Sequence, residues 1–531
     1  MTKVIDKNEV RLPFFGDRLS FVRGLDPLGL QNPSAQAYSY LLPGLNNVTG
    51  RLRSYSFYCW LLTEYARQIQ TTDPKEQKRF VRRAEYILAL IAAHADTNGV
   101  AGSLYALRQL NQGETSFNIG SATYNPDGST TNTYWQYSFG VFGQYYLGSI
   151  RQIGLIEEPL DASGNLLGIY RRTSSNKELL ISGEALAAAF DENVSPENKG
   201  LFLSCLRKGT IDLKQVEKLT PDFNLAHIRT GTEEHNLLLQ LMLDLDEPAN
   251  AVISQKSMRK ATLLHVLRYA DTHKSGVEQR KFTFYAYQAK GEVNHHSDDC
   301  LFGWYYYQLN EYWQVACTAI LNGLLDYLQE REGPGWMLVQ ELLQESTKEI
   351  TELLIQGEVI DSGDVTIAEA LTANLDPEQV LYQDLMRAEG VVRMAMSFAL
   401  IWQLYQQNKQ YLDRLEEYTS SIGIDSKHDV VSFCRKFDRY VTLPVHKFLE
   451  EFLLSNIIYR HQYVAYHKIG GGSQSTQKFI IEDNHIRHIG NFDPGFTGPR
   501  IRNLINFLQD LGLLDAEGRL TDAGQLQLAQ N

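Results

Sequence analysis

The sequence predicts a mainly α-helical protein of several domains. The chain has 531 residues, which is too long for a single hydrophobic core. Its 43% hydrophobic and 21% charged residues are typical of a globular protein. Apolar residues recur with a 3.6-residue period along most of the chain, and only a few short runs look like strands. We therefore expect a helical array or bundle of several domains with small β elements.

The first domain is expected over residues 1–225. It opens with an irregular lead rich in proline and glycine, which cannot form a long regular element. Thr49 is then expected to cap a helix over 51–70, and Asp73 followed by Pro74 predicts the start of a second helix. Short strands and further helical runs complete this domain.

The second domain, over residues 226–425, is expected to be a helical bundle. Nearly all of it has a 3.6-residue apolar period, and no repeat of fixed length indicates a solenoid. Asp376 and Pro377 repeat the capping signal and open a long predicted helix, to about Asn408.

The third domain, over residues 426–531, differs in character. An amphipathic helix from Pro444 to about Ile469 is followed by a glycine-rich break. Two β-like runs, 478–481 and 485–489, then flank a polar turn and predict a hairpin.

A helix from Arg500 to Leu511 follows the hairpin, and Gly512 ends it. A short turn, a strand and a final helix that begins at Thr521 complete the chain. This order of helix, hairpin, helix and strand resembles a winged-helix module.

Charge and cysteine content limit the classes of function. With 63 acidic and 50 basic residues the net charge is −13, so any nucleic-acid contact has to come from a local basic patch. The N-terminus lacks the apolar core of a signal peptide, and no apolar run is long enough to cross a membrane. Five scattered cysteines, none in a CxxC pair, argue against a disulfide framework. We expect a cytoplasmic protein without a cofactor.

The third domain carries a local excess of positive charge. Lys478 and Arg487 lie on the predicted hairpin, and Arg500 and Arg502 lie at the start of the next helix. Cationic side chains near a helix N-terminus can bind phosphates, so this surface is a candidate DNA- or RNA-binding site. The alternative is that the module docks on another protein subunit and that these charges keep it soluble.

The segment 292–299 holds the densest group of potential metal ligands. His295, His296, Asp298 and Asp299 offer imidazole and carboxylate groups for zinc, manganese or iron. They are the basis of an alternative function, a metal-dependent nuclease or phosphohydrolase. Consecutive residues rarely converge on one ion, however. The competing interpretation is a polar loop in which Ser297 or Asp298 caps the next helix and the following carboxylate interacts with the helix dipole, so no bound metal is expected.

Other motifs give little support for an enzyme. Arginine–histidine spacings like those of a group of helical ribonucleases are mostly explained by chance at this composition. The pair Arg460 and His461 is slightly favoured among them, and an exposed helix end would explain it as well. No GxSxG, HExxH, GxGxxG or Walker signature is present.

A block near the N-terminus resembles a block in known proteins. It reads Asn32-Pro33-Ser34-Ala35, Leu42-Pro43-Gly44, Thr49-Gly50-Arg51-Leu52-Arg53-Ser54-Tyr55 and Cys59-Trp60. It is similar to uncharacterised bacterial helical proteins encoded in antiviral defence islands. The resemblance implies a subunit or accessory protein of phage defence and transfers no catalytic residues. The expected function is a non-enzymatic binding or scaffold subunit that acts through protein contacts, and alternatively nucleic-acid contacts, of its C-terminal module.

Overall fold

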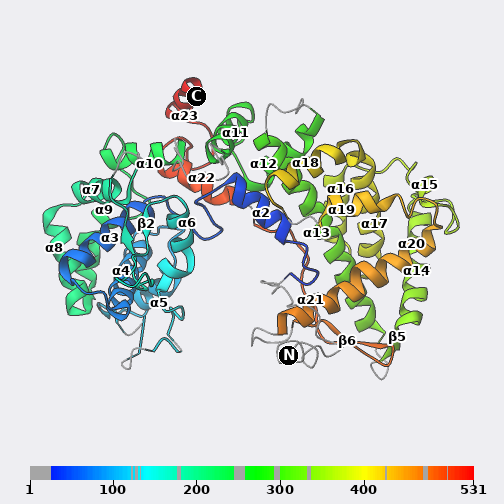
Figure 1. Ribbon diagram of the computed structural model, residues 1–531, viewed down its shortest axis with the longest axis horizontal. Helices are drawn as coiled ribbons and strands as arrows, with labels where there is room; N and C mark the ends of the chain where they lie inside the picture. Colours follow the sequence, from blue (N-terminus) through cyan, green and yellow to red (C-terminus); the bar gives the residue numbers. More distant parts are fainter. Residues whose placement is uncertain are drawn as a thin grey trace. The chain divides into compact units, whose positions relative to one another are not determined.

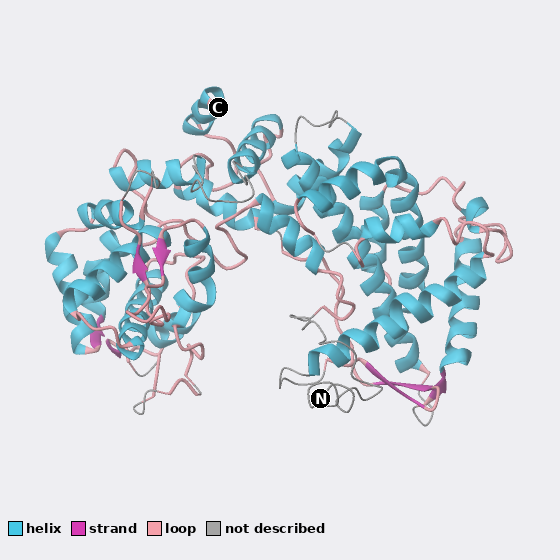
Figure 2. Ribbon diagram, viewed as in Figure 1, coloured by secondary structure: helices cyan, strands magenta, loops and turns pink. Residues whose placement is uncertain are grey.

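A computed structural model shows that helices form most of the described chain and that the strands are short (Figure 2). The predicted mainly α-helical class is confirmed. Within the described ranges, no helix is long and apolar enough to cross a membrane. The structure describes residues 26–120, 123–125, 129–131, 133–175, 181–243, 258–291, 299–331, 336–424, 427–469, 476–498 and 500–531.

The chain forms two compact units, and each combines two separate stretches of sequence. Unit 1 comprises Met1–Ala37 and Gly303–Thr497, and unit 2 comprises Tyr38–Phe302 and Gly498–Asn531. Their ranges meet within α2 (Asn32–Leu41) and near the start of α13 (Asp299–Glu330). The units do not coincide with the predicted domains 1–225, 226–425 and 426–531, because periodicity locates helices without showing which of them pack together.

Unit 2 is largely helical, and its small strands pair antiparallel, β1 with β4 and β2 with β3. Around α3 its core is aromatic, with Phe57 and Trp60 packed against Phe190, Phe202 and Phe223. Its elements, labelled in Figure 1 where there is room, are α3 (Ser54–Gln68), α4 (Pro74–His94), α5 (Ser103–Asn111), β1 (Ser116–Asn118), η1 (Phe142–Tyr146), α6 (Leu147–Gln152), β2 (Ile156–Glu157), β3 (Arg171–Arg172), α7 (Gly183–Asn193), α8 (Pro196–Lys208), β4 (Thr210–Asp212), α9 (Leu213–Phe223), α10 (Glu233–Leu243), α11 (Met258–Thr272), α12 (Gln279–Gln288), η2 (Ala289–Gly291), α22 (Ile501–Asp510) and α23 (Asp522–Gln530).

Of the two helix caps predicted in unit 2, the structure contains one, at Asp73. The carboxylate of Asp73 accepts the N–H of Lys75 at 2.9 Å, so the predicted cap of α4 is confirmed. The expected cap at Thr49 is wrong, because α3 begins at Ser54. The hydroxyl of Thr49 instead donates to the carbonyl of Asn46 and accepts its N–H, which closes a turn ahead of the helix.

Unit 1 is also mainly helical. The long helix predicted from Pro377 is divided, since α16 ends at Arg387 and α17 begins at Gly390, whose φ is +51°. The predicted amphipathic helix after Pro444 contains a π-helical turn, η4. The further elements are β5 (Met337–Leu338), α14 (Val339–Gln356), α15 (Ile367–Ala370), α16 (Glu378–Arg387), α17 (Gly390–Asn408), η3 (Lys409–Tyr411), α18 (Leu412–Ser421), α19 (Val430–Phe437), α20 (Val445–Phe452), η4 (Leu453–Ile458), α21 (Tyr459–Ile469), β6 (Phe479–Glu482) and β7 (His485–His488).

β6 and β7 form the predicted hairpin. At its tip Asp483 and Asn484 have φ of +46° and +63°, as in a type I′ turn. β7 also pairs with β5, which gives a three-stranded sheet of order β5-β7-β6. The helix after the hairpin, α22, belongs to unit 2. The winged-helix module is therefore not confirmed, because its expected parts are divided between the units.

Candidate functional site

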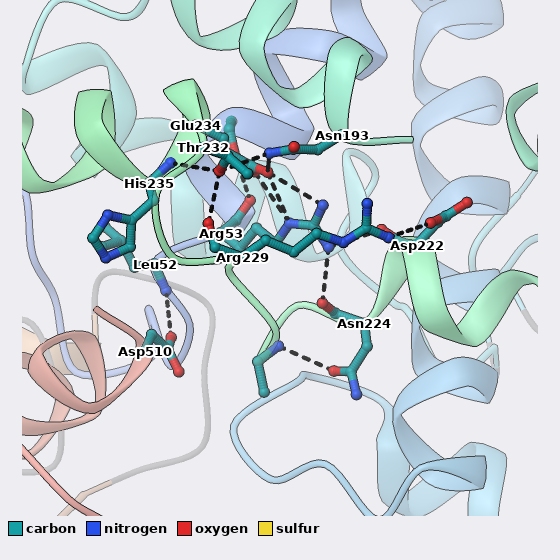
Figure 3. A network of polar contacts seen from close by, with 12 residues as sticks. Leu52, Arg53, Asn193, Asp222, Asn224, Arg229, Thr232, Glu234, His235 and Asp510 are labelled. Carbon is teal, nitrogen blue, oxygen red and sulfur yellow. Dashed lines mark hydrogen bonds and ion pairs between the residues drawn. The ribbon is translucent and has the colours of Figure 1, made fainter. Parts of the chain in front are cut away.

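In unit 2, Arg53 of the N-terminal block forms a buried ion pair with Glu234. Its Nε donates to Oε1 of Glu234 at 3.1 Å and its Nη2 to Oε2 at 3.2 Å (Figure 3). Its Nη1 donates to the backbone carbonyls of Asp222 and Asn224. The side chains of Arg53 and Glu234 are 2% and 0% exposed. Such a deeply buried pair requires hydrogen bonds to its remaining polar atoms, and the carbonyls supply them for the guanidinium.

The carboxylate of Glu234 has further partners. It accepts hydrogen bonds from the hydroxyl of Ser56 at 2.6 Å and from the amide of Asn193 at 2.9 Å. These residues lie on α3, α7 and α10, so the ion pair joins three helices. Because the pair is closed to solvent, we assign it an architectural role.

The neighbouring Arg51 attaches the C-terminal segment of the chain. Its Nη1 pairs with Oδ1 of Asp510 at 2.7 Å, and Oδ2 accepts the N–H of Leu52 at 3.1 Å. Burial raises the pKa of Asp510 to about 7, and the opposing charge of Arg51 offsets part of that effect. One residue further, the carbonyl of Leu511 contacts Nε2 of His235 at 3.2 Å. The two arginines of the block thus hold α10 and α22 against the start of α3.

The four cations predicted to bind nucleic acid do not belong to one unit. Lys478 and Arg487 are in unit 1, and Arg487 lies over the ring of Trp336 at 5.6 Å. Arg500 and Arg502 are at the start of α22 in unit 2. Sequence proximity alone therefore does not define a single phosphate-binding surface.

Arg500 has partners within unit 2. Its Nη2 donates to the hydroxyl of Ser39 at 3.0 Å, and its guanidinium lies over the ring of Tyr38 at 4.5 Å. Burial lowers the pKa of Arg500. Arg502, in contrast, is exposed.

In unit 1, side chains of α21 hold the lead segment 26–29. Three of them donate hydrogen bonds to its backbone carbonyls, and we call this arrangement the α21 clamp. It satisfies carbonyl groups in a stretch that has no regular secondary structure. The pairs are Lys468 with Asp26, His461 with Pro27 (2.9 Å), and Arg460 with Leu28 (2.7 Å) and Gly29 (3.3 Å).

The partners of His461 determine its protonation state. Its Nδ1 donates to the carbonyl of Pro27, and its Nε2 accepts the N–H of Lys478 at 3.0 Å, so the ring is neutral with the proton on Nδ1. Burial lowers the pKa of His461 to about 4, and the cations Lys468 and Lys478 act in the same direction. Both nitrogens of the His461 ring are therefore occupied by backbone groups, which gives the ring a structural role.

A small pocket beside the clamp has a cationic lining, and we call it the cationic pocket. Its volume is about 80 Å³. Lys427, His428, Lys436 and Arg460 line it together with a single carboxylate among its described lining residues, that of Asp429. Nη1 of Arg460 donates to Nε2 of His428 at 3.0 Å. Cations therefore outnumber carboxylates among the described lining residues of this pocket.

A larger pocket of about 600 Å³ in the same unit has the opposite character. Carboxylates of Asp326, Glu330, Glu389 and Asp493 line it, and Arg393 is the one cation among its described lining residues. These carboxylates would attract a cationic group.

The solvent side of α21 presents three tyrosines, which we call the tyrosine face. Tyr459, Tyr463 and Tyr466 are 54%, 51% and 56% exposed. Their i, i+4, i+7 spacing places them in one row, while His461 and Val464 face the interior. The guanidinium of Arg460 lies over the ring of Tyr463 at 5.6 Å. Sequence reasoning missed this face, although the spacing of the tyrosines would have revealed it.

The predicted metal ligands lie largely outside the described residues. His295, His296 and Asp298 are outside them, and Asp299 is the first residue of α13, with a side chain that is not described. Elsewhere in the described chain, no group of three or more histidine, cysteine or acidic residues is placed to hold a metal. The five cysteines all lie among the described residues, where they are buried and form no disulfide.

No family model, curated protein or solved structure matches this chain.

Proposed function

We propose that this protein is a non-enzymatic binding subunit that docks a partner protein through the tyrosine face of α21. The observation that carries the proposal is the row of Tyr459, Tyr463 and Tyr466, each more than half exposed. Exposed aromatic side chains gathered on one face are typical of interaction sites. The bacterial antiviral defence setting that the N-terminal block implies is compatible with such a subunit.

Tyrosine suits a docking surface for physical reasons. Its ring buries a large apolar area at a small cost in conformational entropy, and its hydroxyl keeps a hydrogen-bonding group at the rim. The helix beneath is fixed by the α21 clamp, so little ordering is needed when a partner binds. A nucleic-acid partner and a metal-dependent hydrolase remain the alternatives.

A site-specific photocrosslink tests the proposal. A benzophenone side chain placed at position 463 in the full-length protein should crosslink one defined protein in native cells. The triple variant Tyr459→Ser/Tyr463→Ser/Tyr466→Ser should lose at least about tenfold in affinity for that protein, because tyrosines at interface centres often contribute 2 kcal/mol or more each.

Tyr137, which is 51% exposed in unit 2, offers a matched control. Tyr137→Ser should bind the crosslinked protein as the wild type does. Equal affinity of the triple variant and the wild type would contradict the proposal. Co-purifying nucleic acid that the triple variant loses would assign the face to that partner instead.

A further inference from the structure

We propose that the cationic pocket of unit 1 binds a phosphate group, either as the free ion or as part of a small phosphomonoester. Lys427 and Lys436 stand at its rim, Arg460 lies on α21, and Asn456 on η4 contributes an amide. These groups come from separate stretches of the chain and converge on one cavity. Ammonium and guanidinium donors around a small cavity are the arrangement that recognises phosphate.

Among the described lining residues of the pocket, the cationic side chains outnumber the carboxylates. The carboxylate of Asp429 is already used, since it accepts the N–H of Ser432 as the cap of α19 at 2.8 Å and the hydroxyl of Tyr306 at 2.9 Å. The side chains of Lys436 and Asn456 make no hydrogen bond or ion pair within the described part of the chain. Lys436 and Asn456 therefore offer an ammonium and an amide group to a ligand in the pocket.

Hydrogen bonds fix the guanidinium of Arg460 at the wall of the pocket. Its Nε and Nη2 donate to backbone carbonyls of the α21 clamp, and its Nη1 points to His428 on the pocket wall. Burial lowers the pKa of Arg460, and Asp26 is the carboxylate that opposes this shift. The oxygens of Asp26 accept the N–H groups of Leu28 and Gln31, so they stabilise the lead segment as well. A phosphate in the pocket would add a second negative charge beside this buried guanidinium.

The size of the pocket limits the ligand. A cavity of about 10–15 Å³ is enough for one water molecule. The pocket, at about 80 Å³, therefore accommodates the five heavy atoms of a phosphate group and little more. Any group esterified to the phosphate would have to extend into solvent. The site thus selects the phosphate itself, and this inference does not depend on the tyrosine face.

Calorimetric titration of the full-length protein tests the proposal, with inorganic phosphate and adenosine monophosphate as separate ligands at constant ionic strength. Saturable binding is expected for the wild type. Binding should weaken at least about tenfold in Lys427→Gln/Lys436→Gln, because two charge-assisted contacts are lost. If both ligands bind, the site accepts a phosphate group that is part of a small molecule. If only inorganic phosphate binds, the site accepts the free ion.

Lys348, 76% exposed on α14 and outside the pocket, provides the control. Lys348→Gln should bind phosphate as the wild type does, and all variants should unfold at similar temperatures. The proposal is overturned if the wild type shows no saturable binding tighter than about 10 mM. It is also overturned if the double variant binds as tightly as the wild type.

Discussion

At the scale of single residues, the buried Arg53–Glu234 pair shows why an arginine in this sequence is not by itself a sign of a binding site. Both charges are removed from water, which costs several kcal/mol per ion unless partners compensate. The carbonyls of Asp222 and Asn224, together with Ser56, provide that compensation. The stability of the unit should therefore depend on the pair remaining intact.

The substitution Glu234→Gln removes one charge and nearly preserves shape. We expect it to lower the free energy of unfolding by about 3–5 kcal/mol, because the guanidinium of Arg53 is left buried without a counter-ion. Urea denaturation measures this change. Glu76→Gln breaks an exposed pair with Arg79 and should cost at most about 1 kcal/mol. Equal losses in the two variants would contradict the assignment.

His461 should make stability depend on pH. Its pKa in the folded state, about 4, is below the ordinary value of 6.5, so the unfolded chain binds the proton more tightly. The free energy of unfolding therefore decreases as the pH falls from 6.5 toward 4, and the decrease is about 2 kcal/mol at pH 5.

The variant His461→Gln isolates this effect, since an amide can both donate to Pro27 and accept from Lys478 without titrating. We expect the difference in unfolding free energy between pH 7 and pH 5 to be smaller in the variant than in the wild type by about 2 kcal/mol. Denaturant unfolding at the two pH values provides the measurement. The same pH dependence in both proteins would show that His461 does not titrate as argued.

At the scale of elements, the β6–β7 hairpin is determined largely by its own sequence. Aromatic and β-branched residues of β6 precede a two-residue turn, and Asp and Asn are among the side chains that tolerate the left-handed conformation there. The boundary between α16 and α17 differs in this respect. The apolar period of the sequence continues through residues 388–389, where no proline is present. The structure nevertheless ends α16 before these residues and begins α17 after them.

Asn484 at the turn offers a test of this local control. Asn484→Gly should raise the free energy of unfolding by a few tenths to about 1 kcal/mol, because glycine adopts φ of +63° without steric cost. Asn484→Val should lower it, since a β-branched residue is strained there. Thermal unfolding together with amide exchange in β6 and β7 measures both changes. A stabilising valine would refute the turn assignment.

At the scale of the whole molecule, the last hundred residues are divided between the two compact units. Phe507 on α22 packs edge-to-face on Tyr55 at 5.7 Å, and Asp510 pairs with Arg51. The hairpin completes its sheet with β5. Each part of the range 426–531 thus buries its surface against distant parts of the sequence.

The isolated fragment 426–531 should consequently fail to fold cooperatively. Its apolar helix faces would lack their partners, and burial of these faces is the main source of stability. Circular dichroism during heating and the dispersion of amide proton shifts test this, with the full chain as the reference. A sharp transition with dispersed amide signals would instead support an autonomous winged-helix domain.

The sequence by itself determined the local features of this protein. The apolar period identified the helical class, Asp73 marked the start of α4, and the polar turn identified the hairpin, because caps and turns depend on a few adjacent residues. Only the tertiary structure decided which segments share a core and which cations are exposed. Arg500 and His461 look like surface residues in the sequence, yet distant segments cover them. Packing partners far apart along the chain leave no local pattern, so the two discontinuous units and the cationic pocket emerge only in three dimensions.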